Sequence, residues 1–309
     1  LPDNLEKKIM GKYSKNKIKF ISRLFAMMKK PTVDLYVGIY EVPHGILAIL
    51  SAKWNRRPSV VSIIGNPKYS FRNKGFRGYV TKWIYRKADF ITVTGSASKE
   101  FLINEKGLLE NKVLVLPNSI PIESFRNLKI EKKYDLITLG RISPEKGLIN
   151  FLEIISEVLE LIPDLKVGIA GKGPKQEELA NTIKLKGLEN NVFLLGYVSN
   201  IEIFLNEGKV FVTTSKTEGL PRTAIQSMAC GTPVIASNVG DMKDLVVNNE
   251  TGVLIDDPND NQAFYSSILE LLDNYSEYQE RCIQYVHDNF SSRAGLSTWD
   301  TIFKTIKEK

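Results

Sequence analysis

Short apolar runs alternate along this chain with longer segments in which apolar residues recur at helical spacing. The runs predicted to be buried strands are Val33–Tyr40, Ser59–Ile64, Phe90–Thr94, Lys112–Leu116, Leu136–Leu139, Lys166–Ala170, Val192–Leu195, Val210–Thr213, Pro233–Ala236 and Gly252–Ile255. Helices are predicted between them near residues 45–56, 74–87, 97–107, 147–161, 174–186, 200–206, 221–230 and 241–247. Because this alternation is typical of parallel sheets covered by helices on both faces, the sequence predicts an α/β fold.

The chain has 309 residues, which is enough for two such domains. The segment 117–133 interrupts the alternation with two prolines and six charged residues. We therefore predict two Rossmann-like domains, over residues 1–130 and 131–291. Residues 292–309 are predicted to form a helix with one apolar face, which can pack back on the first domain.

Charge is distributed unevenly between the predicted domains. Residues 1–130 carry 24 Lys and Arg against 9 Asp and Glu, whereas the remaining residues carry 18 against 26. A basic half beside an acidic half indicates an anionic partner on one side only. The chain has two cysteines, two histidines and no cluster at metal-ligand spacing, so we predict reduced thiols, a reducing cytoplasm and no metal site.

Two predicted loops that follow strands of the second domain combine glycines with basic residues. The first contains Gly140, Arg141 and Lys146. Ligands of doubly wound sheets bind beyond the carboxyl ends of strands, where an arginine and a lysine can hold a diphosphate. The second contains Gly171 and Gly173, which allow the backbone to approach a ligand. Each loop alone is also consistent with an ordinary turn that opens a helix.

A third loop, after Thr213, leads into a helix that Pro221 opens and Gly231 closes. The unpaired backbone N–H groups of its first turn and the helix dipole then form a site for a phosphate. Glu218 precedes this helix, so its carboxylate either caps the helix or accepts hydrogen bonds from sugar hydroxyls. Gln226 lies two turns into the helix, within reach of ribose hydroxyls.

Together these three loops resemble those of the retaining GT-B glycosyltransferases of the group-1, or family-4, type. The segment Met228–Ser237 is similar to the small-residue junction between helix and strand in that family. Pro117–Ile120 resembles its interdomain P-N-G-V segment, and Ala88–Asp89 resembles its A-D pair. The resemblance covers roughly residues 33 to 290 and implies a nucleoside-diphosphate sugar as donor, with no metal and no separate cofactor.

The resemblance also implies a role for each matching residue. Arg141 and Lys146 bind the donor diphosphate, and Glu218 holds the hydroxyls of the donor sugar. The remaining donor contacts are expected from Gly140, Gly171, Gly173, Tyr197, Val198, Gly219, Leu220, Pro221 and Gln226. Among these, Tyr197 and Val198 belong to the segment that reads the nucleobase. The two basic side chains and the helix end would stabilise the negative charge that grows on the departing diphosphate.

Several positions depart from the family pattern. Gln226 stands where the family has a second Glu, which should weaken ribose recognition because charge-assisted hydrogen bonds are about twice as strong as neutral ones. Tyr40 stands where the family often has a His, and His44 follows four residues later; both are candidates for the acceptor side. His44 is also consistent with a helix-start or core position. The opening βαβ unit of the family is absent, so the first domain is predicted to be truncated or abbreviated.

Basic residues alternate with aromatic and aliphatic ones in two parts of the first domain, 17–30 and 71–87. Such segments suit an anionic membrane surface, and they are also consistent with core helices that have a solvated basic face. We therefore predict an acceptor that is a glycan of the cell envelope or is linked to a polyprenyl lipid. The predicted location is the cytoplasm, peripheral to the inner face of the cell membrane.

Three other functions are weighed against a transferase. A non-catalytic nucleotide-sugar-binding subunit, or an inactive fragment, would account for Gln226 and for the absent opening unit, and would not hydrolyse the donor. Nucleic-acid binding is suggested by the sequence pI of about 9.1, but the acidic second half and the lack of a nucleic-acid-binding module disfavour it. A sugar-nucleotide epimerase is disfavoured because the Glu218 segment resembles the transferases.

Overall fold

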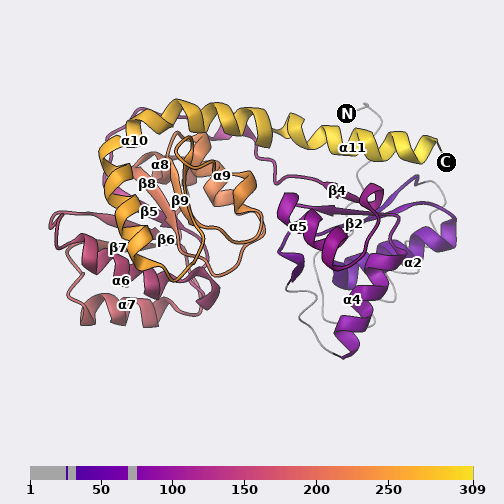
Figure 1. Cartoon of the computed structure of the whole chain (residues 1–309), viewed down its shortest axis with the longest axis horizontal. Helices are drawn as coiled ribbons and strands as arrows, with labels where there is room; N and C mark the ends of the chain where they lie inside the picture. The colour runs from indigo at the N-terminus through magenta and orange to yellow at the C-terminus, as the bar shows by residue number, and fades with distance from the viewer. Residues whose placement is uncertain (1–25, 27–32, 69–74, 309) are drawn as a thin grey trace.

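The computed structural model describes Ala26 and residues 33–68 and 75–308. These residues form two parallel β-sheets with helices packed against them (Figure 1). The first sheet has the strand order β1-β2-β3-β4. Its strands are β1 (Tyr36–Ile39), β2 (Ser59–Ser62), β3 (Phe90–Val93) and β4 (Val113–Val115).

The described helices between the strands of the first domain include α2 (Ile46–Asn55), α4 (Phe76–Lys87) and α5 (Ser96–Glu100). Apolar side chains of these helices pack against the sheet, where Val61 and Ile91 are fully buried with Ile49 of α2 and Ile84 of α4. Of the two basic segments predicted from the sequence, residues 17–30 lie outside the described residues except for Ala26, and so do residues 71–74 of the second.

The second sheet has the strand order β10-β9-β8-β5-β6-β7. Its strands are β5 (Tyr134–Leu139), β6 (Val167–Ala170), β7 (Val192–Gly196), β8 (Gly208–Thr213), β9 (Val234–Ser237) and β10 (Gly252–Ile255). The connecting helices are α6 (Leu148–Val158), α7 (Gln176–Leu185), α8 (Ile201–Asn206) and α9 (Arg222–Ala229). Because β5 lies between β8 and β6 and all pairs are parallel, the carboxyl ends of these three strands are neighbours.

Two long helices run end to end along one side of the molecule (Figure 1). α10 (Asn261–Phe290) lies on the second domain, and α11 (Ser292–Lys307) continues onto the first. α10 begins where Asp260 accepts a hydrogen bond of 2.9 Å from the backbone N–H of Ala263, which satisfies one donor of its first turn. The backbone at Ser291, between the two helices, is extended and forms a bridge with Ile120 of the connection between the domains.

α11 closes one face of the first sheet. Ile302 is fully buried and packs with Val60 and Phe90, and the partly buried Trp299 and Ile306 extend this contact. The helix thus buries the apolar face that its sequence pattern predicts, and it ties the end of the chain to the first domain.

The sequence predicted each of the ten strands, with ends shifted by three residues or fewer. The prediction of a helix over 241–247 is wrong, because only one 3-10 turn, Met242–Asp244, forms there. The side chains at both ends of that turn bind the first domain, as described below. The helix α10 was not predicted as an element. The boundary predicted near residue 130 falls in the connection between β4 and β5.

We expect Ile302→Ala to lower the free energy of unfolding of the first domain by about 2–5 kcal/mol, because the change leaves a cavity under α11. All three tryptophans, Trp54, Trp83 and Trp299, belong to this domain or to α11, so fluorescence during urea denaturation follows its unfolding. The matched variant Ile203→Ala, at a side chain that is 41% exposed, should change stability by less than about 1 kcal/mol. Equal effects of the two variants would contradict this packing.

Candidate active site

Three loops meet at the carboxyl ends of β5, β6 and β8. The loop after β5 begins with Gly140 and contains Lys146, the loop after β6 contains Gly171, and the loop after β8 contains Glu218. Neighbouring strands bring together segments that are about 30 and 75 residues apart in the sequence. The three loops predicted from the sequence are therefore adjacent in the structure.

The glycines of the second loop allow it to pack directly against the first. A Cβ atom on Gly171, whose φ is +134°, would lie 1.7 Å from the carbonyl oxygen of Gly140. A Cβ atom on Gly173 would lie 2.0 Å from the carbonyl oxygen of Ile142. Larger residues at either position would push the loops apart, so the structure gives both glycines a packing role. Their contact with a donor stays a prediction.

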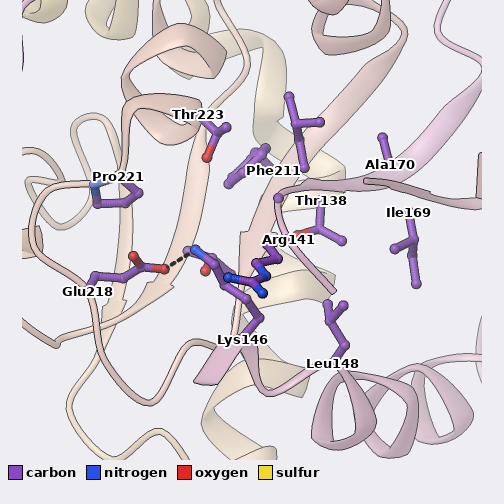
Figure 2. Close-up of a pocket in the computed structure, with 13 residues that line it drawn as sticks. Thr138, Arg141, Lys146, Leu148, Ile169, Ala170, Phe211, Glu218, Pro221 and Thr223 are labelled. Carbon is purple, nitrogen blue, oxygen red and sulfur yellow. Dashed lines mark hydrogen bonds and ion pairs between the residues drawn. The ribbon is translucent and has the colours of Figure 1, made fainter. Parts of the chain in front are cut away.

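Glu218 and Lys146 point toward one another and form an ion pair (Figure 2). Lys146 Nζ lies 2.6 Å from Glu218 Oε1, and the hydroxyl of Ser215 donates a second hydrogen bond of 2.7 Å to the same oxygen. The Ser215 hydroxyl also lies 2.9 Å from that of Thr213. The side chains of Glu218 and Lys146 are only 12% and 24% exposed, so solvent screens this pair less than a surface pair.

Glu218 does not cap the helix that follows it. α9 has Pro221 at its N-cap and no side-chain hydrogen bond to its first turn. Of the two roles that the sequence leaves open for Glu218, helix capping is therefore excluded. No described side chain bonds the N–H groups of the first turn of α9, and these groups carry the positive end of the helix dipole.

These groups surround a small hollow of about 20 Å³, whose wall includes Gly140, Arg141, Lys146, Glu218, Pro221 and Thr223 (Figure 2). Arg141 is exposed and forms no ion pair with any described carboxylate. The wall thus combines a guanidinium, an ammonium and a helix N-terminus, which are the groups that proteins use to bind phosphates. One carboxylate, that of Glu218, balances part of this positive charge.

Other residues predicted to bind the donor do not line this hollow. Tyr197, after β7, is 77% exposed, and Val198 packs partly against the core of the second domain. Gln226 is half-buried on α9. Leu220 is buried, and Asn118 donates a hydrogen bond of 2.6 Å to its carbonyl oxygen. The roles of these residues in donor binding stay predictions.

A larger cavity of about 330 Å³ lies between the domains. Tyr40, Glu41, Ile63, Gly65 and Asn66 line it from the first domain, and Thr217, Glu218 and Gly219 from the second. Glu218 therefore belongs both to the small hollow and to this cavity. Of the two acceptor-side candidates, Tyr40 lines the cavity, whereas the ring of His44 lies 3.1 Å from the carbonyl oxygen of Ile39 and is not part of the wall.

The loop after β9 joins the domains through two carboxylates. Asp241 Oδ2 accepts hydrogen bonds from the hydroxyls of Thr94 (2.7 Å) and Ser98 (2.9 Å), and its Oδ1 accepts one from the backbone N–H of Ser98 (2.8 Å). Asp244 accepts hydrogen bonds from the hydroxyl and the backbone N–H of Ser96. The two carboxylates together accept hydrogen bonds from two backbone N–H groups at the start of α5, from across the domain interface.

The same loop supports the segment that carries Glu218. The backbone N–H of Asp241 donates a hydrogen bond of 2.9 Å to the carbonyl oxygen of Gly219. A Cβ atom on Gly240 would lie 2.1 Å from the carbonyl oxygen of Glu218, and one on Gly219 would lie 2.5 Å from that of Ile64. The loop with Glu218 is thus packed between Gly240 and the first domain.

Four residues of this region received no role from the sequence, namely Glu41, Ser215, Asp241 and Asp244. Ser215 stands three residues before Glu218, a spacing that offers a local signal for a side-chain contact. The partners of Asp241 and Asp244 lie more than 140 residues away, so no local pattern indicates them. Within the described parts of the chain, no group of three or more His, Cys, Asp or Glu could hold a metal ion.

Burial raises the pKa of the Asp241 carboxyl above its ordinary value of 3.8, although hydrogen bonds from Thr94 and Ser98 oppose the shift. A group whose pKa is raised on folding contributes stability that is present below the ordinary pKa and lost as pH rises through the raised one. We therefore expect the stability of the wild-type protein relative to Asp241→Asn to fall as pH rises above the ordinary pKa of 3.8, measured by urea denaturation.

The matched variant is Asp300→Asn, which removes an exposed carboxylate of α11. No described residue of the second domain forms a hydrogen bond or ion pair with this carboxylate. The pH dependence should be specific to Asp241. A relative stability of Asp241→Asn that stays constant with pH, or rises, would contradict the burial of this charge at the domain interface.

The family model for glycosyl transferases group 1 matches residues 119–288, which is more than half of the chain. The chain therefore belongs to this family. It is 29% identical over 198 residues to an uncharacterised glycosyltransferase of Methanocaldococcus jannaschii, in an alignment that covers 60% of this chain and 49% of the relative. It is 27% identical over 280 residues to the UDP-Gal:α-D-GlcNAc-diphosphoundecaprenol α-1,3-galactosyltransferase of Escherichia coli, covering 83% of this chain and 71% of that enzyme.

Solved glycosyltransferase structures share the fold. A variant of S. aureus TarM, crystallised with fondaparinux, α-GlcNAc-glycerol and UDP, superposes with a TM-score of 0.78 at 21% identity. The match covers 92% of this chain and 58% of TarM, and the chain spans about half the length of the archaeal relative. The prediction of a GT-B architecture with two Rossmann-like domains is confirmed by this match and by the two parallel sheets.

Proposed function

We propose that this chain transfers a sugar from a uridine-diphosphate sugar to a lipid-linked or cell-envelope glycan, with retention of the anomeric configuration. One observation carries the proposal: Glu218 forms part of the wall of both the phosphate-binding hollow and the interdomain cavity. A donor with its diphosphate in the hollow has its sugar at Glu218. The acceptor then approaches that sugar from the cavity.

The donor and acceptor classes are supported by the similar proteins. The E. coli relative is named for UDP-Gal as donor and a diphosphoundecaprenol-linked sugar as acceptor, and TarM was crystallised with UDP. The E. coli enzyme makes an α-linkage, and UDP-galactose is itself an α-anomer, so its name describes a retaining transfer. The resemblance of the Glu218 segment to retaining transferases supports the same outcome for this chain.

The proposed chemistry uses the positive groups of the hollow. As the bond between the sugar and the phosphate breaks, negative charge grows on the departing diphosphate. Arg141, Lys146 and the N-terminus of α9 would stabilise that charge without a metal ion, since all three border the hollow. Tyr197, Val198 and Gln226 are proposed to hold the nucleoside on the outer side of the hollow.

Donor binding requires the ion pair between Lys146 and Glu218 to separate. The hollow of about 20 Å³ beside this pair leaves little room for a phosphate group, and in the proposed binding step the Lys146 side chain moves aside. Its ammonium then exchanges one carboxylate partner for the phosphates, and Glu218 is released to accept hydrogen bonds from the sugar. Ser215 keeps the Glu218 carboxylate in place during this exchange.

We expect Glu218→Gln and Lys146→Met to reduce the turnover of UDP-sugars by about 100-fold or more, because each removes a charge aimed at the reacting groups. The assay measures UDP release from a panel of UDP-sugars with a diphosphoundecaprenol-linked acceptor. Lys146→Met should also weaken the binding of UDP, whereas Glu218→Gln should weaken only the binding of the intact donor. UDP binding is followed as the rise in melting temperature with ligand concentration.

The exposed Glu189→Gln variant is the matched control and should retain wild-type turnover. Full activity of Glu218→Gln at a donor concentration below KM would refute the central assignment. A protein that is stabilised by UDP-sugars but releases no UDP would instead be a non-catalytic binding subunit.

We propose in addition that α4 contacts an anionic membrane surface. Phe76 and Tyr79 are 81% and 69% exposed, and the basic residues Arg86 and Lys87 lie in the last turn of the same helix. Exposed aromatic rings beside basic residues are typical of helices that lie in the membrane interface. Within the described ranges, no helix is long and apolar enough to span a bilayer.

The double variant Phe76→Ala/Tyr79→Ala should reduce binding to phosphatidylglycerol vesicles by about tenfold or more, since it removes the apolar contact with the interface. Co-sedimentation with vesicles measures the effect. Leu185→Ala, at an 87% exposed residue of the second domain, is the matched control. Binding that does not respond to anionic lipid or to the double variant would rule out this surface.

A further inference from the structure

The turn after β1 brings a second carboxylate, that of Glu41, into the interdomain cavity. The backbone N–H of Gly45 donates a hydrogen bond of 3.0 Å to the carbonyl oxygen of Tyr40, which folds the turn back on the strand. A Cβ atom on Gly38 would lie 2.6 Å from the carbonyl oxygen of His44, so the turn packs closely on β1. Tyr40 itself has φ +65° and ψ 159°, a region that is unfavourable for non-glycine residues and is concentrated at functional sites.

Tyr85 holds the Glu41 carboxylate in position. The Tyr85 hydroxyl donates a hydrogen bond of 2.8 Å to Glu41 Oε1. Tyr85 is 1% exposed and packs in the core of the first domain, so the hydroxyl is a rigid donor. Within the described residues, Glu41 forms no ion pair, and no group donates a hydrogen bond to its Oε2.

Glu41 and Glu218 belong to the two domains that form the cavity. Glu41 lies on the wall of the first domain together with Tyr40 and Asn66, and Glu218 lies on the wall of the second. The volume of about 330 Å³ is at the lower end of the range of about 300–1,000 Å³ for small-molecule sites, which suits one sugar ring and part of its neighbour. An acceptor that reaches the donor sugar at Glu218 therefore fills the space beside Glu41.

We propose that Glu41 is an acceptor-binding residue, whose carboxylate accepts hydrogen bonds from hydroxyl groups of the terminal acceptor sugar while Tyr85 positions it. The inference rests on the proposed transferase function and adds a residue to its acceptor side. A carboxylate with one oxygen held by the protein can accept hydrogen bonds from adjacent hydroxyls through the other, and such charge-assisted bonds are the strong ones. Removing them should weaken the acceptor more than the donor.

The charge of Glu41 also bears on which acceptor sugars fit. The described wall of the cavity contains no lysine or arginine, so nothing on it compensates a negative charge on the acceptor ring. A neutral sugar is accommodated, whereas a uronic acid would be repelled by the unpaired carboxylate. The terminal acceptor sugar is therefore expected to be neutral, whatever the charge of the lipid diphosphate behind it.

The test compares Glu41→Gln, Glu41→Ala and Tyr85→Phe in two-substrate kinetics with UDP-Gal as donor and α-GlcNAc-diphosphoundecaprenol as acceptor. If the wild-type protein does not use UDP-Gal, the donor is chosen from the panel of UDP-sugars. Glu41→Ala should raise the KM for the acceptor about 10- to 100-fold, the range expected for a lost hydrogen bond to a charged group. Glu41→Gln should give an intermediate rise, and Tyr85→Phe a smaller one. The KM for the donor should change by less than about threefold in all of them.

The split between the two KM values separates acceptor binding from a merely structural role, because misfolding would affect donor and acceptor alike. The nearly isosteric Glu41→Gln variant keeps the test valid if Glu41→Ala folds poorly, and Glu189→Ala is the matched control at an exposed site. If the wild-type protein transfers the sugar and the KM for the acceptor is unchanged in Glu41→Gln and Glu41→Ala, the role of Glu41 is wrong but the proposed function stands. Absence of transfer by the wild-type protein would count against the proposed function instead.

Discussion

The buried carboxylate of Asp241 connects the two domains and the loop of the active site at one point. It accepts hydrogen bonds from Thr94 and Ser98 of the first domain, and the backbone N–H of the same residue donates to Gly219 beside Glu218. A buried polar group that loses its partner costs about 1–3 kcal/mol, and a charged one costs more, so these contacts form together or are lost together. The position of Glu218 therefore depends on the contact between the domains.

The site therefore has one wall on each domain. On the side of the second domain, Arg141, Lys146 and the start of α9 concentrate positive charge around a small hollow, where Lys146 is paired with Glu218. On the side of the first domain, a wider cavity ends at Glu41, which a buried tyrosine holds in place. In the proposed function, the donor and the acceptor meet at Glu218 from these two sides, so both require the contact between the domains.

Much of the second domain could be predicted from the sequence, because strands, glycines and basic residues follow one another in local order. The loops that contain Arg141 and Glu218 were identified in this way, and the structure brings them together. Contacts between distant residues could not be predicted. The pair Lys146–Glu218 joins positions 72 residues apart, and Asp241 reaches Thr94 across 147 residues. The prediction of a helix over 241–247 is wrong for the same reason, because Asp241 and Asp244 bind distant residues of the first domain.

The most direct test of the account is a crystal structure of the protein with a bound UDP-sugar. We expect the diphosphate between Arg141 and the N-terminus of α9, with Lys146 Nζ on a phosphate oxygen and the Glu218 carboxylate on the sugar hydroxyls. A nucleotide bound elsewhere, or one bound while Lys146 and Glu218 stay paired, would contradict it.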